Sequence, residues 1–302
     1  MDFRELQYIV SIAKHQNITK ASEEVFVSQP TLSKFVQNLE KELGQPLFRR
    51  LGNRFLLSYA GERYVEKAKA ILGMKKELDQ ELGDIFKKGT GELKIAFPIM
   101  RGTYMLPLTL SVFREEFPRV KVTVSEANSA VLEELILAGE TELAFFTLPI
   151  NNPNISYDII KEEEIILVMS TNHPLADQGI AMAGCKYPWF DITKLKDETF
   201  IMQKLDQRTR HIVDQILYNA NMKPRASLEI RNILASVELA ADGYGIAFVG
   251  ETHLRHIQLR KKTACFSVGS PRTMTSFVAA YRCGIYLPNY AQRYIQIVKD
   301  FT

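Results

Sequence analysis

The sequence predicts an α/β protein that begins with a mostly helical winged helix-turn-helix and continues through one long linker helix into two α/β lobes. Three observations predict this fold. Three short helical segments crowd the first fifty residues, a heptad-like repeat follows, and strands then alternate with helices. With 302 residues, of which 46% are hydrophobic, the chain is long enough for more than one core.

The first fifty residues are expected to form three short helices. Apolar residues recur at helical spacing within residues 3–13, and Thr19 can cap a second helix. Ser28 can cap a third, where Pro30 is tolerated because a first-turn N–H has no partner in any case. The third helix ends at Gly44 and buries one stripe made of Leu32, Val36, Leu39 and Leu43. Its opposite face is polar and basic, which is typical of a helix-turn-helix.

A β-hairpin is expected next. Gly52-Asn53 is a turn signal between two apolar stretches within residues 46–57. Arg49, Arg50 and Arg54 crowd this hairpin. A hairpin that directly follows a helix-turn-helix is interpreted as a wing.

Residues 59–88 are predicted to form one long helix. Its apolar residues alternate four and three apart, with Lys75 in the missing position, and are Tyr64, Ala68, Ile71, Leu78, Leu82 and Ile85. Such a heptad stripe predicts a partner helix and therefore a dimer. Lys75, Gly73 and Gly83 interrupt the pattern, and the alternative is a helix that packs on its own domain.

Beyond a linker at Gly89-Thr90-Gly91 the pattern becomes α/β. Strands are expected at 93–97, 120–124, 143–146, 164–169, 199–202 and 246–249. Helices are expected at 106–117, 131–138, 207–220, 232–242 and 288–300. This alternation predicts parallel strands with right-handed crossovers, and its length favours two lobes over one.

Composition and charge exclude several classes of protein. The apolar runs are too short to span a bilayer and no leader segment is recognised, so a cytoplasmic protein without a membrane partner is expected. The net charge of +3 falls entirely within residues 1–90, which is only suggestive of nucleic-acid binding. Cys185, Cys265 and Cys283 are scattered, which suits a reducing compartment and favours neither a zinc site nor a redox pair.

No catalytic pattern is recognised. The sequence lacks G-x-S-x-G, P-loop, H-E-x-x-H and G-x-G-x-x-G motifs. His253 and His256 can share one helix face, but no third metal ligand accompanies them. Glu162-Glu163-Glu164 is expected to be a solvated lead-in to a strand. We therefore expect no enzyme, no catalytic residues, no metal and no cofactor.

With these features in place, the sequence resembles a LysR-type transcriptional regulator over its full length. The resemblance is densest in residues 1–61, and its motifs are Ser28-Gln29-Pro30-Thr31-Leu32-Ser33, Leu43-Gly44, Pro46-Leu47-Phe48, Arg50, Leu57-Ser58 and Ala60-Gly61. Looser matches follow at Leu106-Pro107, Gly139-Glu140, His173-Pro174-Leu175-Ala176 and Gly243-Tyr244-Gly245-Ile246-Ala247.

The resemblance implies three parts. A winged helix-turn-helix DNA-binding domain is expected at 1–58, a dimerisation helix at 59–88 and an effector-binding domain at 89–302. The effector-binding domain is expected to have two periplasmic-binding-protein-like lobes. Lobe I is expected at about 91–163 and 269–302, and lobe II at about 164–268.

The third helix has the shape to enter a major groove of double-stranded DNA. Gln29 can bond adenine at two points, and Arg54 on the wing suits phosphate or a narrow minor groove. The residues expected to contact DNA are Ser28, Gln29, Pro30, Thr31, Ser33, Lys34, Gln37, Arg50 and Arg54. The alternative is that the third helix only packs and its outer face is solvated.

The resemblance also implies that a small metabolite, usually an anion, binds between the lobes. The residues expected to contact it are Pro98, Ile99, Met100, Arg101, Ser129, Thr147 and Gln203. Many family members carry hydroxyl side chains where this chain has residues 98–100, so either the effector is more apolar or Arg101 clamps it. Alternatively, Arg101 is an exposed surface residue, Ser129 only caps a helix and Thr147 only fills a strand end.

The sequence thus predicts a LysR-type regulator, activator or repressor, whose effector alters DNA binding or transcription activation. The implied partners are operator or promoter DNA, a small-molecule effector, further copies of the chain in a homodimer or homotetramer, and RNA polymerase. The alternative function is a cytoplasmic small-molecule-binding module with a helical oligomerisation domain. The arginine-rich wing disfavours that alternative.

Overall fold

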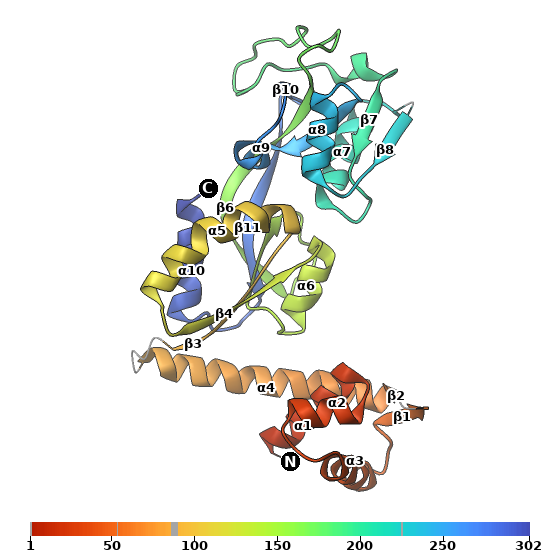
Figure 1. The fold of residues 1–302 in the computed structure, drawn as a ribbon, viewed down its shortest axis with the longest axis vertical. Helices are drawn as coiled ribbons and strands as arrows, with labels where there is room; N and C mark the ends of the chain where they lie inside the picture. Colours follow the sequence, from red (N-terminus) through yellow and green to blue (C-terminus); the bar gives the residue numbers. More distant parts are fainter. Residues whose placement is uncertain (1, 53, 86–89, 225) are drawn as a thin grey trace. The chain divides into compact units, whose positions relative to one another are not determined.

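A computed structural model describes residues 2–52, 54–85, 90–224 and 226–302. The chain divides into two compact units, Met1–Lys88 and Gly89–Thr302, and each is described by itself (Figure 1). Some predicted features fall outside the described residues. These are Asn53 of the hairpin turn, residues 86–88 at the end of the predicted long helix, Gly89 of the linker, and the side chain of Ile85.

The first unit contains three short helices, a hairpin and a long helix. These are α1 (Phe3–His15), α2 (Ile18–Glu24), α3 (Gln29–Leu43), β1 (Phe48–Leu51), β2 (Arg54–Leu57) and α4 (Tyr59–Ile85). The predicted cap of the second helix is wrong by two residues. The Asn17 side chain accepts hydrogen bonds from the backbone N–H groups of Thr19 and Lys20, because an Asx side chain reaches two residues ahead.

The core of the first unit lies between α1, α2, α3 and the hairpin. Ile9, Ile12 and Leu32 are fully buried there, next to Phe48 and Phe55 of the hairpin. The predicted stripe of the third helix is buried only in part, because Leu43 at its end is 44% exposed. The hairpin is therefore fixed to the helices by its apolar face.

The long helix α4 has two different halves. Val65 and Ala68 are buried within the first unit, so the first half packs on its own unit. Leu78 and Leu82 are 55% and 43% exposed within the described chain. The predicted heptad stripe is thus buried inside the unit in the first half of α4 and exposed in the second half.

The second unit alternates strands with helices. Its elements are β3 (Gly91–Phe97), α5 (Ile99–Glu116), β4 (Val120–Glu126), α6 (Ser129–Leu137), β5 (Leu143–Thr147), β6 (Ile155–Ser170), η1 (Ile192–Leu195), β7 (Thr199–Met202), α7 (Arg208–Asn219), β8 (Ala226–Glu229), α8 (Ile233–Ala241), β9 (Ile246–Gly250), α9 (Glu251–His256), β10 (Thr263–Ser267), β11 (Thr273–Arg282) and α10 (Asn289–Asp300).

These strands form one continuous sheet, in which a parallel part in each lobe is joined through the antiparallel strands β6 and β11. The order is β4-β3-β5-β11-β6-β9-β7-β8, with β10 paired to β6. We use lobe I for β3–β5 with α5, α6 and α10, and lobe II for η1, β7–β10 and α7–α9. The strands β6 and β11 pair along their length and run between the lobes (Figure 1).

Helices cover both faces of the sheet in each lobe. In lobe I, α5 and α10 bury one apolar cluster and α6 buries another. In lobe II, α7 and α8 do the same on opposite faces. Residues 143–146 are all fully buried, as expected of a parallel strand covered on both sides.

Several predicted boundaries differ from the structure. The helix expected at 106–117 begins at Ile99 and continues through Pro107, whose missing N–H misleadingly indicates a helix start. The strand expected at 164–169 spans Ile155–Ser170. The elements β8, β10, β11 and α9 are not anticipated at all, because nothing local in the sequence indicates which strand crosses between lobes.

Candidate functional site

The first turn of α3 is exposed to solvent. Ser28 is the N-cap, and its Oγ accepts from the Thr31 backbone N–H at 3.3 Å and lies 2.7 Å from Thr31 Oγ1. Pro30 occupies the first turn, where its missing N–H costs nothing. Buried Leu32 and Val36 fix the inner face of the helix, so its polar face points outward.

The structure describes all nine residues expected to contact DNA and leaves them accessible. The exposed ones are Ser28, Gln29, Pro30, Thr31, Lys34, Gln37, Arg50 and Arg54, and Ser33 is half-buried. Three of these positions, residues 29–31, belong to a single helical turn. The polar face of α3 is therefore an open surface.

The wing adds cations beside this unit's helices. Leu51 pairs with Arg54 across the hairpin end, and both are exposed. The Arg50 guanidinium lies 4.9 Å from the centroid of the Phe55 ring, which anchors Arg50 by a cation–π contact. Phe55 itself is buried, so the hairpin positions its arginines from a fixed base.

Sequence reasoning missed one residue near this surface. Phe26 is 94% exposed and has φ 55° in the turn between α2 and α3. A bulky residue with positive φ is uncommon. Only a search for apolar residues inside a turn could have singled it out.

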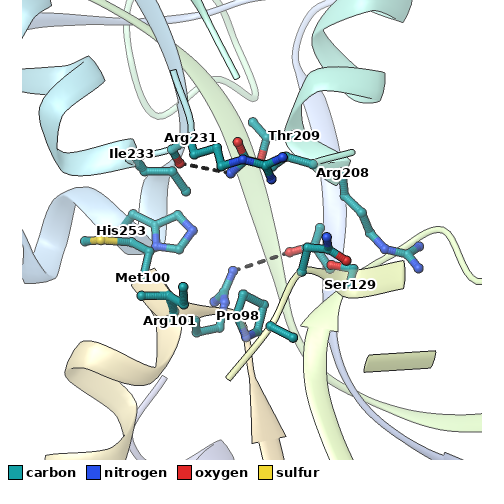
Figure 2. A pocket seen from close by; sticks show the side chains of 14 residues that line it. Pro98, Met100, Arg101, Ser129, Arg208, Thr209, Arg231, Ile233 and His253 are labelled. Carbon is teal, nitrogen blue, oxygen red and sulfur yellow. Dashed lines mark hydrogen bonds between the residues drawn. The ribbon is translucent and has the colours of Figure 1, made fainter. Parts of the chain in front are cut away.

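A cavity of about 210 Å³ lies between the two lobes of the second unit. Figure 2 shows its walls from close by. The lining residues are Pro98, Ile99, Met100, Arg101, Ala127, Asn128, Ser129, Thr147, Gln207, Arg208, Thr209, Arg231, Ile233 and His253. Three of them are arginines and none is an acid.

Four helices begin at this cavity. The first residues of α5, α6, α7 and α8 are Ile99, Ser129, Arg208 and Ile233, and all four line it. The starts of α5 and α7 have no side-chain cap, so their first N–H groups are not taken up by a capping side chain. Helix N-termini carry partial positive charge, so the cavity favours a negatively charged ligand.

The alternative that Arg101 is an exposed surface residue is wrong. Its side chain is 2% exposed, and its Nη2 donates to Glu163 Oε1 at 2.6 Å and to Thr147 Oγ1 at 3.4 Å. Its guanidinium also lies 3.9 Å from the centroid of the Phe277 ring. Arg101 joins α5 of lobe I to the crossing strand β6 by a buried ion pair.

Two of the three consecutive glutamates of β6 are buried as well, so the expectation of a solvated lead-in is wrong for Glu163 and Glu164, whereas Glu162 is exposed. Glu163 and Glu164 are 1% and 2% exposed, because β6 crosses between the lobes at this point. Burial alone would raise the pKa of Glu163, but the charge and hydrogen bond of Arg101 act against it. The net pKa lies below the usual value for a glutamate.

The two histidines of α9 surround Tyr104 of α5. His253 Nδ1 lies 3.3 Å from the Tyr104 hydroxyl, and the His256 ring stacks on the Tyr104 ring at 4.2 Å. Burial, followed by the charge of Arg101, lowers the pKa of His253 to about 3. His253 therefore faces the cavity as a neutral imidazole at physiological pH.

Arg208 and Arg231 were missed by sequence reasoning. Arg208 of lobe II forms an ion pair with Glu133 of lobe I and lies 5.0 Å from the Phe146 ring centroid. Arg231 forms an ion pair with Asp206 at 2.5 Å. Both arginines lie at or next to predicted helix starts, which is the signal that could have found them.

Six of the seven residues expected to contact an effector line the cavity, and Gln203 does not. The Gln203 side chain is 1% exposed, and its Nε2 donates to Ser236 Oγ at 3.5 Å and the Phe248 carbonyl at 3.4 Å. Gln203 thus holds β9 and α8 together. The cap of α6 is Asn128, so Ser129 does not cap that helix.

Other chemistry is absent from the described parts of the chain. No group of three or more His, Cys, Asp or Glu residues there is arranged to hold a metal ion. The three cysteines are free thiols. Of the helices among these residues, none combines the length and apolar character needed to cross a membrane.

A second hollow, of about 720 Å³, lies along α7 and the turn before β11. It is bounded by Trp189, His211 and Arg272, of which the last two are exposed. Within the described residues, no buried polar atom that lacks a hydrogen-bond partner belongs to its lining. The cavity between the lobes is therefore the better candidate for a ligand.

Comparisons with known proteins indicate the same family for both units of the chain. Residues 3–62 match the family described as "Bacterial regulatory helix-turn-helix protein, lysR family", and residues 87–302 match "LysR substrate binding domain". The transcriptional regulator YwbI of Bacillus subtilis is 29% identical over 301 residues, which cover 100% of this chain and 97% of YwbI.

Two solved structures resemble this chain over nearly its full length. Full-length OxyR from Pseudomonas aeruginosa has a TM-score of 0.76 at 21% identity, covering 99% of this chain and 94% of OxyR. Full-length CbnR, solved with its target DNA, has a TM-score of 0.61 at 21% identity and covers 100% of both chains. At this identity the likeness concerns the fold.

Proposed function

The chain belongs to the LysR family of transcriptional regulators, and from this premise we propose which surfaces carry its function. Members of this family are regulators of transcription rather than enzymes. The first unit binds operator DNA through α3 and the wing. A small anionic effector binds in the cavity between the lobes and alters DNA binding or transcription activation.

The observation that carries the DNA-binding surface is the open first turn of α3. Gln29 and Thr31 are exposed at a helix N-terminus, the end of a recognition helix that reaches base edges. Gln29 bonds an adenine edge at two points, and Pro30 and Thr31 contact a thymine methyl group. The CbnR structure with target DNA concerns a relative in fold and supports this use of the unit.

The remaining polar side chains hold the protein on the duplex. Ser28 and Ser33 contact phosphates through their hydroxyls, and Lys34 and Gln37 extend the same face. Arg50 and Arg54 contact phosphates or a narrow minor groove from the wing. These contacts fix the register in which Gln29 reads the sequence.

The exposed apolar residues of α4 support pairing of two chains. Met74, Leu78 and Leu82 are 59%, 55% and 43% exposed, and such a stripe is expected to be covered by a partner helix. The proposed assembly is a cytoplasmic homodimer or homotetramer on promoter DNA, with RNA polymerase as a further partner. Pairing would set the spacing of two DNA half-sites.

The cavity supports an anionic effector through its three arginines and four helix N-termini. Arg208 and Asn128 also connect the lobes, since they bond Glu133 and Asp206 across the cleft. A ligand between the lobes therefore acts on contacts that set their spacing. It shifts the regulator only by its differential affinity for two arrangements.

The test is fluorescence anisotropy of the purified full chain on the intergenic DNA beside its own coding sequence, over a series of salt concentrations. Gln29→Ala should remove preference over scrambled duplex by about 1–3 kcal/mol while keeping salt-sensitive binding. Arg54→Ala should weaken binding to both duplexes alike and lower the salt slope by about 1.

Arg63→Ala is the matched control, because Arg63 is an exposed arginine of the same unit that already pairs with Glu66 at 2.5 Å on α4. It should leave both preference and slope unchanged. Sequence preference that survives Gln29→Ala intact would refute the base-reading role. Loss of binding to only one duplex in Arg54→Ala would refute the phosphate role.

A further inference from the structure

Two buried donors belong to residues that line the cavity. Among the described residues, Arg101 Nη1 and Arg208 Nε are the only buried side-chain nitrogens without a hydrogen-bond partner, and both residues line this cavity. A buried donor without a partner costs free energy, so native structures rarely keep one unless something else satisfies it. The two oxygens of a carboxylate supply the missing acceptors.

Both arginines already form an ion pair with a glutamate. Arg101 Nη2 holds Glu163 at 2.6 Å, and Arg208 Nη2 holds Glu133. Arg231, the third arginine of the lining, holds Asp206 at 2.5 Å. The cavity therefore offers two free donors, together with helix dipoles, rather than several unpaired cations.

Another part of the cavity lining is apolar. Met100 of lobe I packs against the lobe II cluster that contains Ile233. Figure 2 shows Met100 and Ile233 on one side of the cavity with His253, and Ser129 and Arg208 on the other. His253 is neutral and the three arginines of the lining already hold acidic partners, so a second carboxylate in the cavity would find no unpaired cation.

The size of the cavity limits the ligand further. Its volume of about 210 Å³ compares with the apolar cavity of about 150 Å³ that takes up benzene in another protein. A single ring or a short branched chain with one carboxylate fits this space. A nucleotide or an extended chain does not.

From this geometry we infer that the effector is a compact monocarboxylate with an apolar body. Its carboxylate lies between Arg101 Nη1 and Arg208 Nε, beside Ser129 at the start of α6. Its hydrocarbon lies against Met100 and Ile233. The inference rests on the proposed function of the cavity and adds the chemical class of its ligand.

The test is isothermal titration of the full chain with four probes of defined chemistry. Benzoate and isovalerate are the monocarboxylates, glutarate is the dicarboxylate, and benzamide is the neutral analogue of benzoate. Benzoate, glutarate and benzamide have the same number of non-hydrogen atoms, so size does not separate them. Benzoate or isovalerate should bind at least about tenfold more tightly than glutarate and benzamide.

Two variants examine the free donors and the apolar part of the lining separately. Arg208→Gln should weaken binding of the best monocarboxylate by about tenfold or more, since it removes a hydrogen bond to a charged group. Met100→Lys should reverse the preference towards glutarate, because it adds an unpaired cation in the apolar part of the lining. Met100 is only half-buried, so the lysine has a route to solvent.

Lys204→Gln is the matched control for loss of a cation near the start of α7. Lys204 pairs with Glu229 at 3.4 Å and does not line the cavity, so probe affinities should not change. A reversal of preference in Met100→Lys cannot arise from general loss of folding, because a misfolded chain loses all probes together.

The outcomes separate the inference from the function on which it rests. Glutarate that binds the native chain more tightly than either monocarboxylate, and depends on Arg208, overturns the inference and leaves the cavity as an anion site. Absence of binding by all three acids, in a chain that still binds its DNA, overturns both. An affinity equal for benzoate and benzamide also overturns the inference, because the carboxylate would then contribute nothing.

Discussion

Replacing Arg101 by methionine should destabilise the second unit strongly. The substitution leaves Glu163, which is 1% exposed, without its 2.6 Å ion-pair partner. Breaking a buried ion pair by removing one partner costs about 3–5 kcal/mol. For a domain of this size, each kcal/mol lowers Tm by about 2–4 °C, so Tm should fall by about 6–20 °C.

The assay is thermal unfolding followed by tryptophan fluorescence. The chain has one tryptophan, Trp189, and it lies in the second unit, so the signal reports that unit. The double variant Arg101→Met with Glu163→Leu should recover most of the loss, because it removes the buried charge as well. Thr147, which also bonds both partners, stays in place as a weak donor.

The pH dependence supplies an internal check on the cause. In Arg101→Met, burial raises the pKa of the unpaired Glu163 carboxyl above its unfolded value. A group with a raised folded pKa stabilises the fold more as pH falls, so the difference from the native chain should shrink between pH 7.5 and 5.5. A Tm loss under about 2 °C, or a double variant as unstable as the single one, would refute the reasoning.

Two further predictions concern the buried histidine and the long helix. The pKa of His253 is lowered to about 3, so only the unfolded state takes up a proton as pH falls below about 6.5. This histidine should therefore lower the free energy of unfolding by about 2 kcal/mol between pH 6.5 and 5. His253→Gln should remove that drop, whereas His211→Gln, at an exposed position, should not. Equal slopes of unfolding free energy against pH in the native chain and both variants would contradict the prediction. The double variant Leu78→Asn with Leu82→Asn should lower the oligomer mass measured by light scattering, whereas Glu81→Asn on the same helix should not. An unchanged mass in the double variant would mean that this stripe does not pair with a second chain.

Much of the first unit could be predicted because its signals are local. The cap at Ser28 and the terminator at Gly44 act within one helix, and each is found in the structure. The cap of α2 failed by two residues because Asn17 and Thr19 are both good caps, and only the loop geometry chooses between them.

The second unit depends on contacts far apart in sequence, and there prediction was weaker. Three consecutive glutamates indicate a solvated segment, yet the crossing of β6 between lobes buries Glu163 against an arginine of α5. Gln203 has the right place near the start of lobe II, but its side chain turns inward to Phe248. No local pattern encodes either outcome.

The pairing of β6 with β11 contains one extra residue. Phe277 is opposite Lys161 and Val278 is opposite Ile159, so Ile160 has no partner and forms a β-bulge. Because side chains alternate along a strand, the bulge shifts the phase of everything beyond it by one. Deleting Ile160 would turn Glu163 to the other side of the strand and bring a neighbouring residue to Arg101. A change in chain length at this position would thus change which side chain bonds Arg101 at the cavity, without substituting any residue that lines the cavity.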